Sequence, residues 1–214
     1  MSQAVTPVTG SRDTRLKYNP PNGPAAHREE MTPEASLPAD PHIALTHALQ
    51  QLADVLGVTT DEQYVQNPVG VMACSLGGHV RHCLDHFESL ANAVGRDAID
   101  YDQRERGTAI ETNRSTALES IKRLTTAFDR LKCAELRQSI RVRSILAADG
   151  AAIETESSIG RELVFVLSHT IHHSALIAAM CKTLGIALPA WFGYAPATIA
   201  HLDGAPCVQS PSSR

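Results

Sequence analysis

Residues 161–177 read RELVFVLSHTIHHSALI and lie inside a helix that the sequence predicts from Ser157 or Ser158 to Leu184. This helix is apolar nearly all round, which is typical of a helix at the centre of a helical protein. His169 and His173 are four residues apart and therefore share one face, whereas His172 points partly aside. Because histidines, serines and a threonine interrupt the apolar run, we interpret it as a buried helix and not as a membrane span of about 20 apolar residues.

A second histidine-bearing segment, residues 77–90, reads GGHVRHCLDHFESL. It belongs to a helix predicted over residues 68–94, before the stop signal of Gly95. His79, His82 and His86 are three and four residues apart and form one stripe on this helix.

Two further apolar periods predict helices over residues 41–56 and from Asn113 or Ser115 to Leu131. Residues 139–146 and 152–156 flank the Asp149–Gly150 turn signal and predict a small β-hairpin. The charged stretch 97–112 is predicted to be a loop, and residues 196–202 a short last helix. The expected fold is all-α, an up-down four-helix bundle over residues 41–202 with one hairpin before the last long helix. Flexible tails are expected at 1–40, where six of the twelve prolines lie, and at 203–214.

Composition narrows the range of partners. The net charge of −4 and the pI near 6.2 provide no basic surface for nucleic acid or for an anionic membrane. The odd count of five cysteines, without a CxxC pair, indicates reduced thiols in a cytoplasmic protein. The first residues have no apolar segment of the secretory kind.

The two histidine clusters suggest a metal site. Two imidazoles at positions i and i+4 can bind one ion from a rigid helix, and a third from a facing helix completes a three-ligand set. Such a set leaves one coordination position open, as in catalytic sites. The alternative is that these histidines are hydrogen-bonded core residues. Burying unpaired imidazoles would cost on the order of 1–3 kcal/mol each, so the pattern favours metal binding over this alternative.

The two segments together resemble the DinB-like superfamily, which includes YfiT-like metal-dependent hydrolases, bacillithiol and mycothiol S-transferases, and part of the ergothioneine sulfoxide synthases. The resemblance covers about residues 41–202 and implies the four-helix bundle. It also implies that His82, His169 and His173 bind a divalent ion such as Zn, Ni or Fe, with a low-molecular-weight thiol as a further cofactor in some members. The chain departs from the family pattern at Ser174 and at Ala175, which argues against iron-dependent sulfoxide-synthase chemistry.

The resemblance leaves His79 and His86 without fixed roles. They are candidate proton shuttles, because imidazole titrates near neutral pH, and they could equally be alternative ligands or groups that orient the ligands. Arg104 and Arg106 are candidate contacts for an anionic substrate, although a solvated loop would explain them as well.

The remaining side chains have competing interpretations. Asp85 and Glu162 could hydrogen-bond the ligand imidazoles or simply face water. The aromatic group Trp191, Phe192 and Tyr194 could line a pocket, form a homodimer contact or cover one end of the bundle. We expect a metal-dependent hydrolase or thiol transferase acting on an unknown small molecule. A non-enzymatic protein with a structural ion is the second hypothesis, and an interaction module with merely buried histidines is a weaker third.

Overall fold

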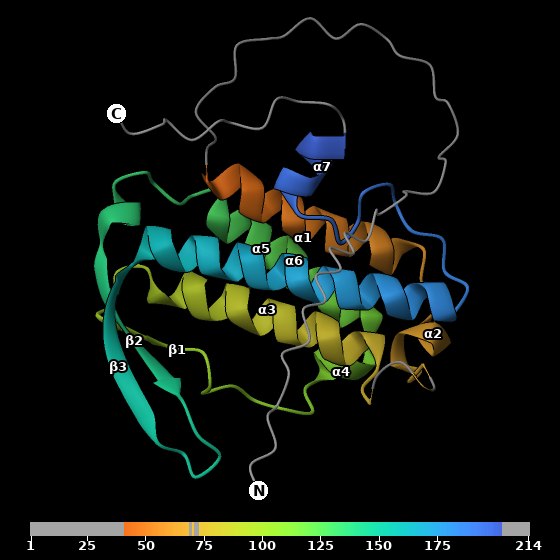
Figure 1. Ribbon diagram of the computed structural model, residues 1–214, viewed down its shortest axis with the longest axis horizontal. Helices are drawn as coiled ribbons and strands as arrows, with labels where there is room; N and C mark the ends of the chain where they lie inside the picture. The colour runs from red at the N-terminus through yellow and green to blue at the C-terminus, as the bar shows by residue number, and fades with distance from the viewer. Residues whose placement is uncertain (1–40, 69, 71–72, 203–214) are drawn as a thin grey trace, which may run out of the picture. The chain divides into compact units, whose positions relative to one another are not determined.

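The computed structural model describes residues 41–68, 70 and 73–202, and the predicted tails at 1–40 and 203–214 lie outside this range. The described residues are mostly helical, with one small sheet (Figure 1). The longer helices are α1 (Pro41–Gly57), α3 (Leu76–Ala93), α5 (Arg114–Phe128) and α6 (Ile159–Thr183). The shorter ones are α2 (Asp61–Val65), α4 (Ala109–Thr112), the 3-10 helix η1 (Glu135–Arg137) and α7 (Pro196–Leu202).

Side-chain caps fix where three of the four long helices begin. Ser75 accepts a hydrogen bond from the Gly78 backbone N–H at 3.1 Å and starts α3. Asn113 caps α5 and Ser158 caps α6 in the same way. Of the alternatives that the sequence left open, Asn113 and Ser158 are therefore confirmed as caps.

The four long helices share one hydrophobic core. Helix α1 packs against α5 and α6, and α3 packs against the same two helices from its own side. Leucines dominate the core, and Phe87 and Phe128 meet edge to face with ring centres 5.9 Å apart. The apolar period of residues 41–56 predicts that Ile43 faces the core, but this side chain is 60% exposed at the start of α1.

The sequence interpretation missed several short elements. Helix α3 begins at Leu76 and not at Pro68, because the described residues just before Ser75 form turns and bends. The separate helix α2 precedes it, opened by a capping box between Thr60 and Gln63. The predicted loop 97–112 contains a strand and the helix α4.

The predicted hairpin is confirmed, and it is part of a larger sheet. Strands β2 (Ser139–Ile145) and β3 (Ala152–Ser158) pair antiparallel, and β1 (Ala98–Asp100) pairs with β2 in parallel. The parallel pairing brings the segment after α3 next to the strand pair that leads into α6. The described chain is therefore helical with a three-stranded sheet, where the sequence predicted a hairpin alone.

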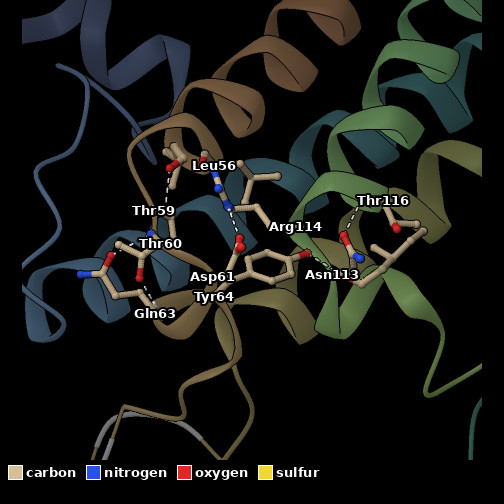
Figure 2. Close-up of polar contacts among 11 residues, drawn as sticks. Leu56, Thr59, Thr60, Asp61, Gln63, Tyr64, Asn113, Arg114 and Thr116 are labelled. Carbon is tan, nitrogen blue, oxygen red and sulfur yellow. Dashed lines mark hydrogen bonds and ion pairs between the residues drawn. The ribbon is translucent and has the colours of Figure 1, made fainter.

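Arg114 ties together three segments near the end of α1, as Figure 2 shows. Its Nε lies 2.8 Å from a carboxylate oxygen of Asp61, and its Nη1 donates to the carbonyl of Leu56 at 2.9 Å. Close by, the Tyr64 hydroxyl donates to the Ile110 carbonyl at 2.6 Å. These contacts hold α2 against the end of α1 and the start of α5.

Helix α6 is long and apolar enough to cross a membrane. Buried helices of soluble proteins share that length and composition, so neither property decides where the protein resides. The four cysteines in the described part of the chain are free thiols, with Cys83 and Cys181 buried and Cys74 and Cys133 exposed.

Candidate metal centre

Helices α3 and α6 lie side by side and carry the histidines of both predicted clusters (Figure 1). The shortest contact between the clusters joins His82 and His169, whose Nε2 atoms are 2.9 Å apart. At this separation one ring donates a hydrogen bond to the other. Two of the three predicted metal ligands therefore meet directly, one from each helix.

His86 is the third member of the tightest histidine group. Its ligand atoms and those of His82 and His169 lie within 4.8 Å of one another. The His86 Nδ1 donates to the His82 carbonyl at 2.9 Å, because a carbonyl oxygen can only accept. In a neutral ring this leaves Nε2 with its lone pair free for a metal ion.

His173, the other predicted ligand, is near this group but pairs elsewhere. Its ring centre is 4.5 Å from that of His82, and its Nδ1 lies 3.1 Å from the Nδ1 of His79. His79 is buried, and its Nε2 has no hydrogen-bond partner among the described residues. His172 is exposed and lies aside, as the sequence predicted.

Burial lowers the pKa of each of these five clustered histidines. The pKa falls to about 3 at His82 and to about 4 at His169 and His173. Repulsion from neighbouring imidazolium charges is a smaller cause at these three rings. They are therefore neutral at pH 7, which is the form that binds a metal ion.

The spacing of His82 and His169 fits a shared ion. Imidazole nitrogens lie about 2.0–2.1 Å from Zn²⁺, so two of them on one ion are roughly 2.9–3.4 Å apart for angles of about 90–109°. The observed 2.9 Å falls within this range. A third imidazole, from His86 or His173, would need only a side-chain adjustment to reach the same point.

Aromatic residues near the sheet contact the histidines, and one of them is hydrogen-bonded to a buried acid. Tyr101 stacks on His86 with ring centres 5.2 Å apart and planes at 13°. Its hydroxyl donates to the buried carboxylate of Glu162 at 3.0 Å, and Ser157 donates to the same carboxylate at 2.6 Å. Phe165 contacts both Tyr101 and His169.

The two acids considered as partners of the imidazoles have other partners. Asp85 forms an ion pair with Arg81. Glu162 accepts from Tyr101, Ser157 and Arg161, and so acts on His86 only through the Tyr101 ring. Neither forms a hydrogen bond with a histidine among the described residues, so the first of the two alternatives, a direct contact with the imidazoles, is not found.

A concave pocket of about 280 Å³ lies beside this group. Tyr101 and Phe165 line it and also contact the histidines, while Arg161 and Glu162 contribute polar atoms. His82, His169 and His173 are only partly buried, so solvent also reaches the cluster itself.

The C-terminal aromatic residues lie at a different place. Trp191, Phe192 and Tyr194 line an open groove along the second half of α6, which agrees with the pocket-wall alternative. Phe192 is buried, whereas Trp191 and Tyr194 are exposed and meet edge to face.

The two candidate anion contacts differ in their surroundings. Arg104 is partly buried, and its Nε is buried without a hydrogen-bond partner among the described residues. Arg106 is exposed. Tyr101 and Phe165 were not predicted to touch the site. The contact of Tyr101 depends on the path of the chain after β1. Phe165 lies four residues before His169 on α6, a local spacing that could have predicted its contact.

Comparison with known proteins gives limited help. No family model matches the chain. The chain is similar to FK506-binding protein 5 of Rhizopus delemar, with 33% identity over 105 residues, which are 49% of this chain and 27% of that protein. The match thus spans about a quarter of the relative's length, and it does not establish a family.

Proposed function

We propose that this chain is a metal-dependent enzyme of the DinB-like type, built as an up-down four-helix bundle from α1, α3, α5 and α6. The contact that carries the proposal is the 2.9 Å separation of the His82 and His169 Nε2 atoms between two adjacent helices. Neutral imidazoles at this spacing suit a divalent ion such as Zn, Ni or Fe. The resemblance in sequence assigns the third ligand to His173, and the tightest grouping in space assigns it to His86.

An ion with an open coordination position supplies Lewis acidity for hydrolysis or for transfer of a low-molecular-weight thiol. The chain's own residues would hold and orient the reactants. Tyr101 and Phe165 wall the adjacent pocket and limit the access of water from that side. If His173 is the third ligand, His79 and His86 each contact a ligand ring and are placed to move a proton.

A structural ion in a non-enzymatic protein is the second candidate. A sealed site would favour it, whereas an accessible one favours an enzyme. The partial exposure of His82, His169 and His173 and the neighbouring pocket support the enzyme. A homodimer, a cytoplasmic location and the lack of nucleic-acid and membrane partners stay predictions. The name of the Rhizopus delemar protein describes binding of FK506. Because the match covers about a quarter of that protein's length, we do not propose FK506 binding for this chain.

The test is metal binding by protein purified without a histidine tag. We expect the wild-type chain to take up Zn²⁺ or Ni²⁺ in a titration followed by calorimetry and metal analysis. His82→Ala should abolish uptake, whereas the matched control His172→Ala, on the exposed side of α6, should retain it. A wild-type chain that takes up neither ion would refute the proposal.

The same titration identifies the third ligand. We expect a large loss of affinity from either His86→Ala or His173→Ala, and the variant with the larger loss names the residue. If both variants bind as tightly as the wild type, a three-histidine site is excluded. Activity of the loaded protein is then assayed on esters, amides and thiol–electrophile pairs, and any activity that survives His82→Ala does not come from this site.

A further inference from the structure

The segment that carries Arg104 is anchored to helix α3 on both sides of this residue. Tyr101, three residues before it, stacks on His86. Glu105, directly after it, accepts a hydrogen bond through its carbonyl from Arg81 Nη1 at 3.5 Å, and Arg81 is next to His82 in α3. The segment that carries Arg104 therefore follows the turn of α3 between His82 and His86.

The guanidinium of Arg104 has no partner among the described residues. Its Nε is buried without a hydrogen bond, and it takes part in none of the ion pairs between described residues. The nearby acid Asp85 is taken by Arg81, which also pairs with Glu111. A charged group that is partly removed from water without a partner is costly, so its presence calls for an explanation.

The charge of Arg104 acts on the same rings that would bind the ion. Its proximity is one of the causes that lower the pKa of His82, His86 and His169. This agrees with the position of the segment set by the two anchors at Tyr101 and Glu105.

We propose that Arg104 binds a carboxylate of the small-molecule substrate and so holds the rest of that molecule beside the metal ligands. The substrate class is thus a carboxylic acid, an inference that rests on the proposed function of the histidine site. A guanidinium presents a planar fork that matches a carboxylate. Arg81 already pairs with Asp85 and Glu111, which leaves the Arg104 guanidinium available to a carboxylate of the substrate.

The experiment measures the binding of succinate by calorimetry in a buffer without other carboxylates. It uses the full chain, once metal-free in the presence of a chelator and once loaded with Zn²⁺. We expect Arg104→Gln to weaken succinate binding about 10- to 100-fold, as is typical for the loss of hydrogen bonds to a charged group. Arg104→Lys should be intermediate because it keeps the charge and loses the fork. The matched control Arg96→Gln, exposed just after α3 and without a role in the site, should bind like the wild type.

Two further measurements separate this proposal from others. Arg104→Gln should unfold at the same or a higher temperature than the wild type without succinate, because it removes an unpaired cation. It should also keep its affinity for Zn²⁺. Unchanged succinate binding in Arg104→Gln, a marked loss of its thermal stability, or tighter binding of inorganic phosphate than of succinate by the wild type would each overturn the carboxylate site. If the chain fails to bind metal but the metal-free protein binds succinate through Arg104, the metal proposal alone fails.

Discussion

Gly77 lies where α3 approaches α4 closely. We expect replacement of Gly77 by alanine to destabilise the protein, whereas the same replacement at the neighbouring Gly78 should not. A Cβ atom at Gly77 would overlap the carbonyl oxygen of Glu111 and lie 2.8 Å from Cε1 of Tyr64. At Gly78 the nearest atom would be Cβ of Cys74 at 3.5 Å, an ordinary contact. Gly78→Ala is therefore the matched control in the same turn of the helix.

The expected difference follows from these distances. Both substitutions gain about 0.5–1 kcal/mol from replacing glycine by alanine in a helix, so this gain cancels in the comparison. Overpacking typically costs about 1–3 kcal/mol, and the upper end applies at Gly77 because the overlapped atom belongs to the backbone. Gly77→Ala should thus be about 3 kcal/mol less stable than Gly78→Ala, which corresponds to roughly 6–12 °C in Tm for a chain of this size.

The assay is urea unfolding followed by circular dichroism, with thermal melts as a second measurement. Gly78→Ala should be at least as stable as the wild type. If the two variants unfold at the same urea concentration, the close approach of α4 to α3 is not as described, and the contact of Glu111 with Arg81 loses its support too.

Three further outcomes test other parts of the fold. Arg114→Ala should lower the free energy of unfolding by about 1–2 kcal/mol, since it removes hydrogen bonds to two segments. The control Arg123→Ala breaks an exposed ion pair of the same helix and should lower it by at most about 1 kcal/mol. Equal losses in the two variants would contradict this prediction. Tyr101→Phe should cost about 1.5–3 kcal/mol in urea unfolding because the buried Glu162 carboxylate loses a donor. A neutral effect would show that Ser157 and Arg161 satisfy the carboxylate without the tyrosine hydroxyl. Burial raises the pKa of Cys83 to about 12, so peptide mapping after treatment of the native protein with N-ethylmaleimide at pH 8 should find it unmodified. The pKa of Cys83 is higher in the folded than in the unfolded chain. The free energy of unfolding is therefore unaffected by this thiol below its unfolded pKa near 9, and it falls as the pH rises above that value.

The long elements could be predicted from the sequence because their signals are local. The apolar periods and the caps of α5 and α6 lie within single helices, and the Asp149–Gly150 turn marks the hairpin. The missed elements are short. Strand β1 has three residues and forms only because β2 pairs with it, and α2 offers one capping box and too few residues for a period.

The candidate site also has one part that could be predicted from the sequence and another that could not. Helical spacing places His79, His82 and His86 on one stripe, and His169 and His173 on another, without knowledge of the fold. Which histidines meet depends on the offset between α3 and α6, and no local pattern encodes that offset. The stacking of Tyr101 on His86 and the missing partner of Arg104 depend on the path of the segment after β1, so they required the structure.

The charges of the sheet bear on how the protein behaves in concentrated solution. Arginines on the central strand β2 face acids on both neighbours, with Arg143 pairing with Asp100 of β1 and Arg141 with Glu154 of β3. Within the described chain, β3 is an edge strand, and its exposed side chains include Glu154 and Glu156. Two molecules that approached by this edge would bring like charges together, so the strand resists aggregation by edge-to-edge pairing. A dimer of the predicted kind would have to form through another face.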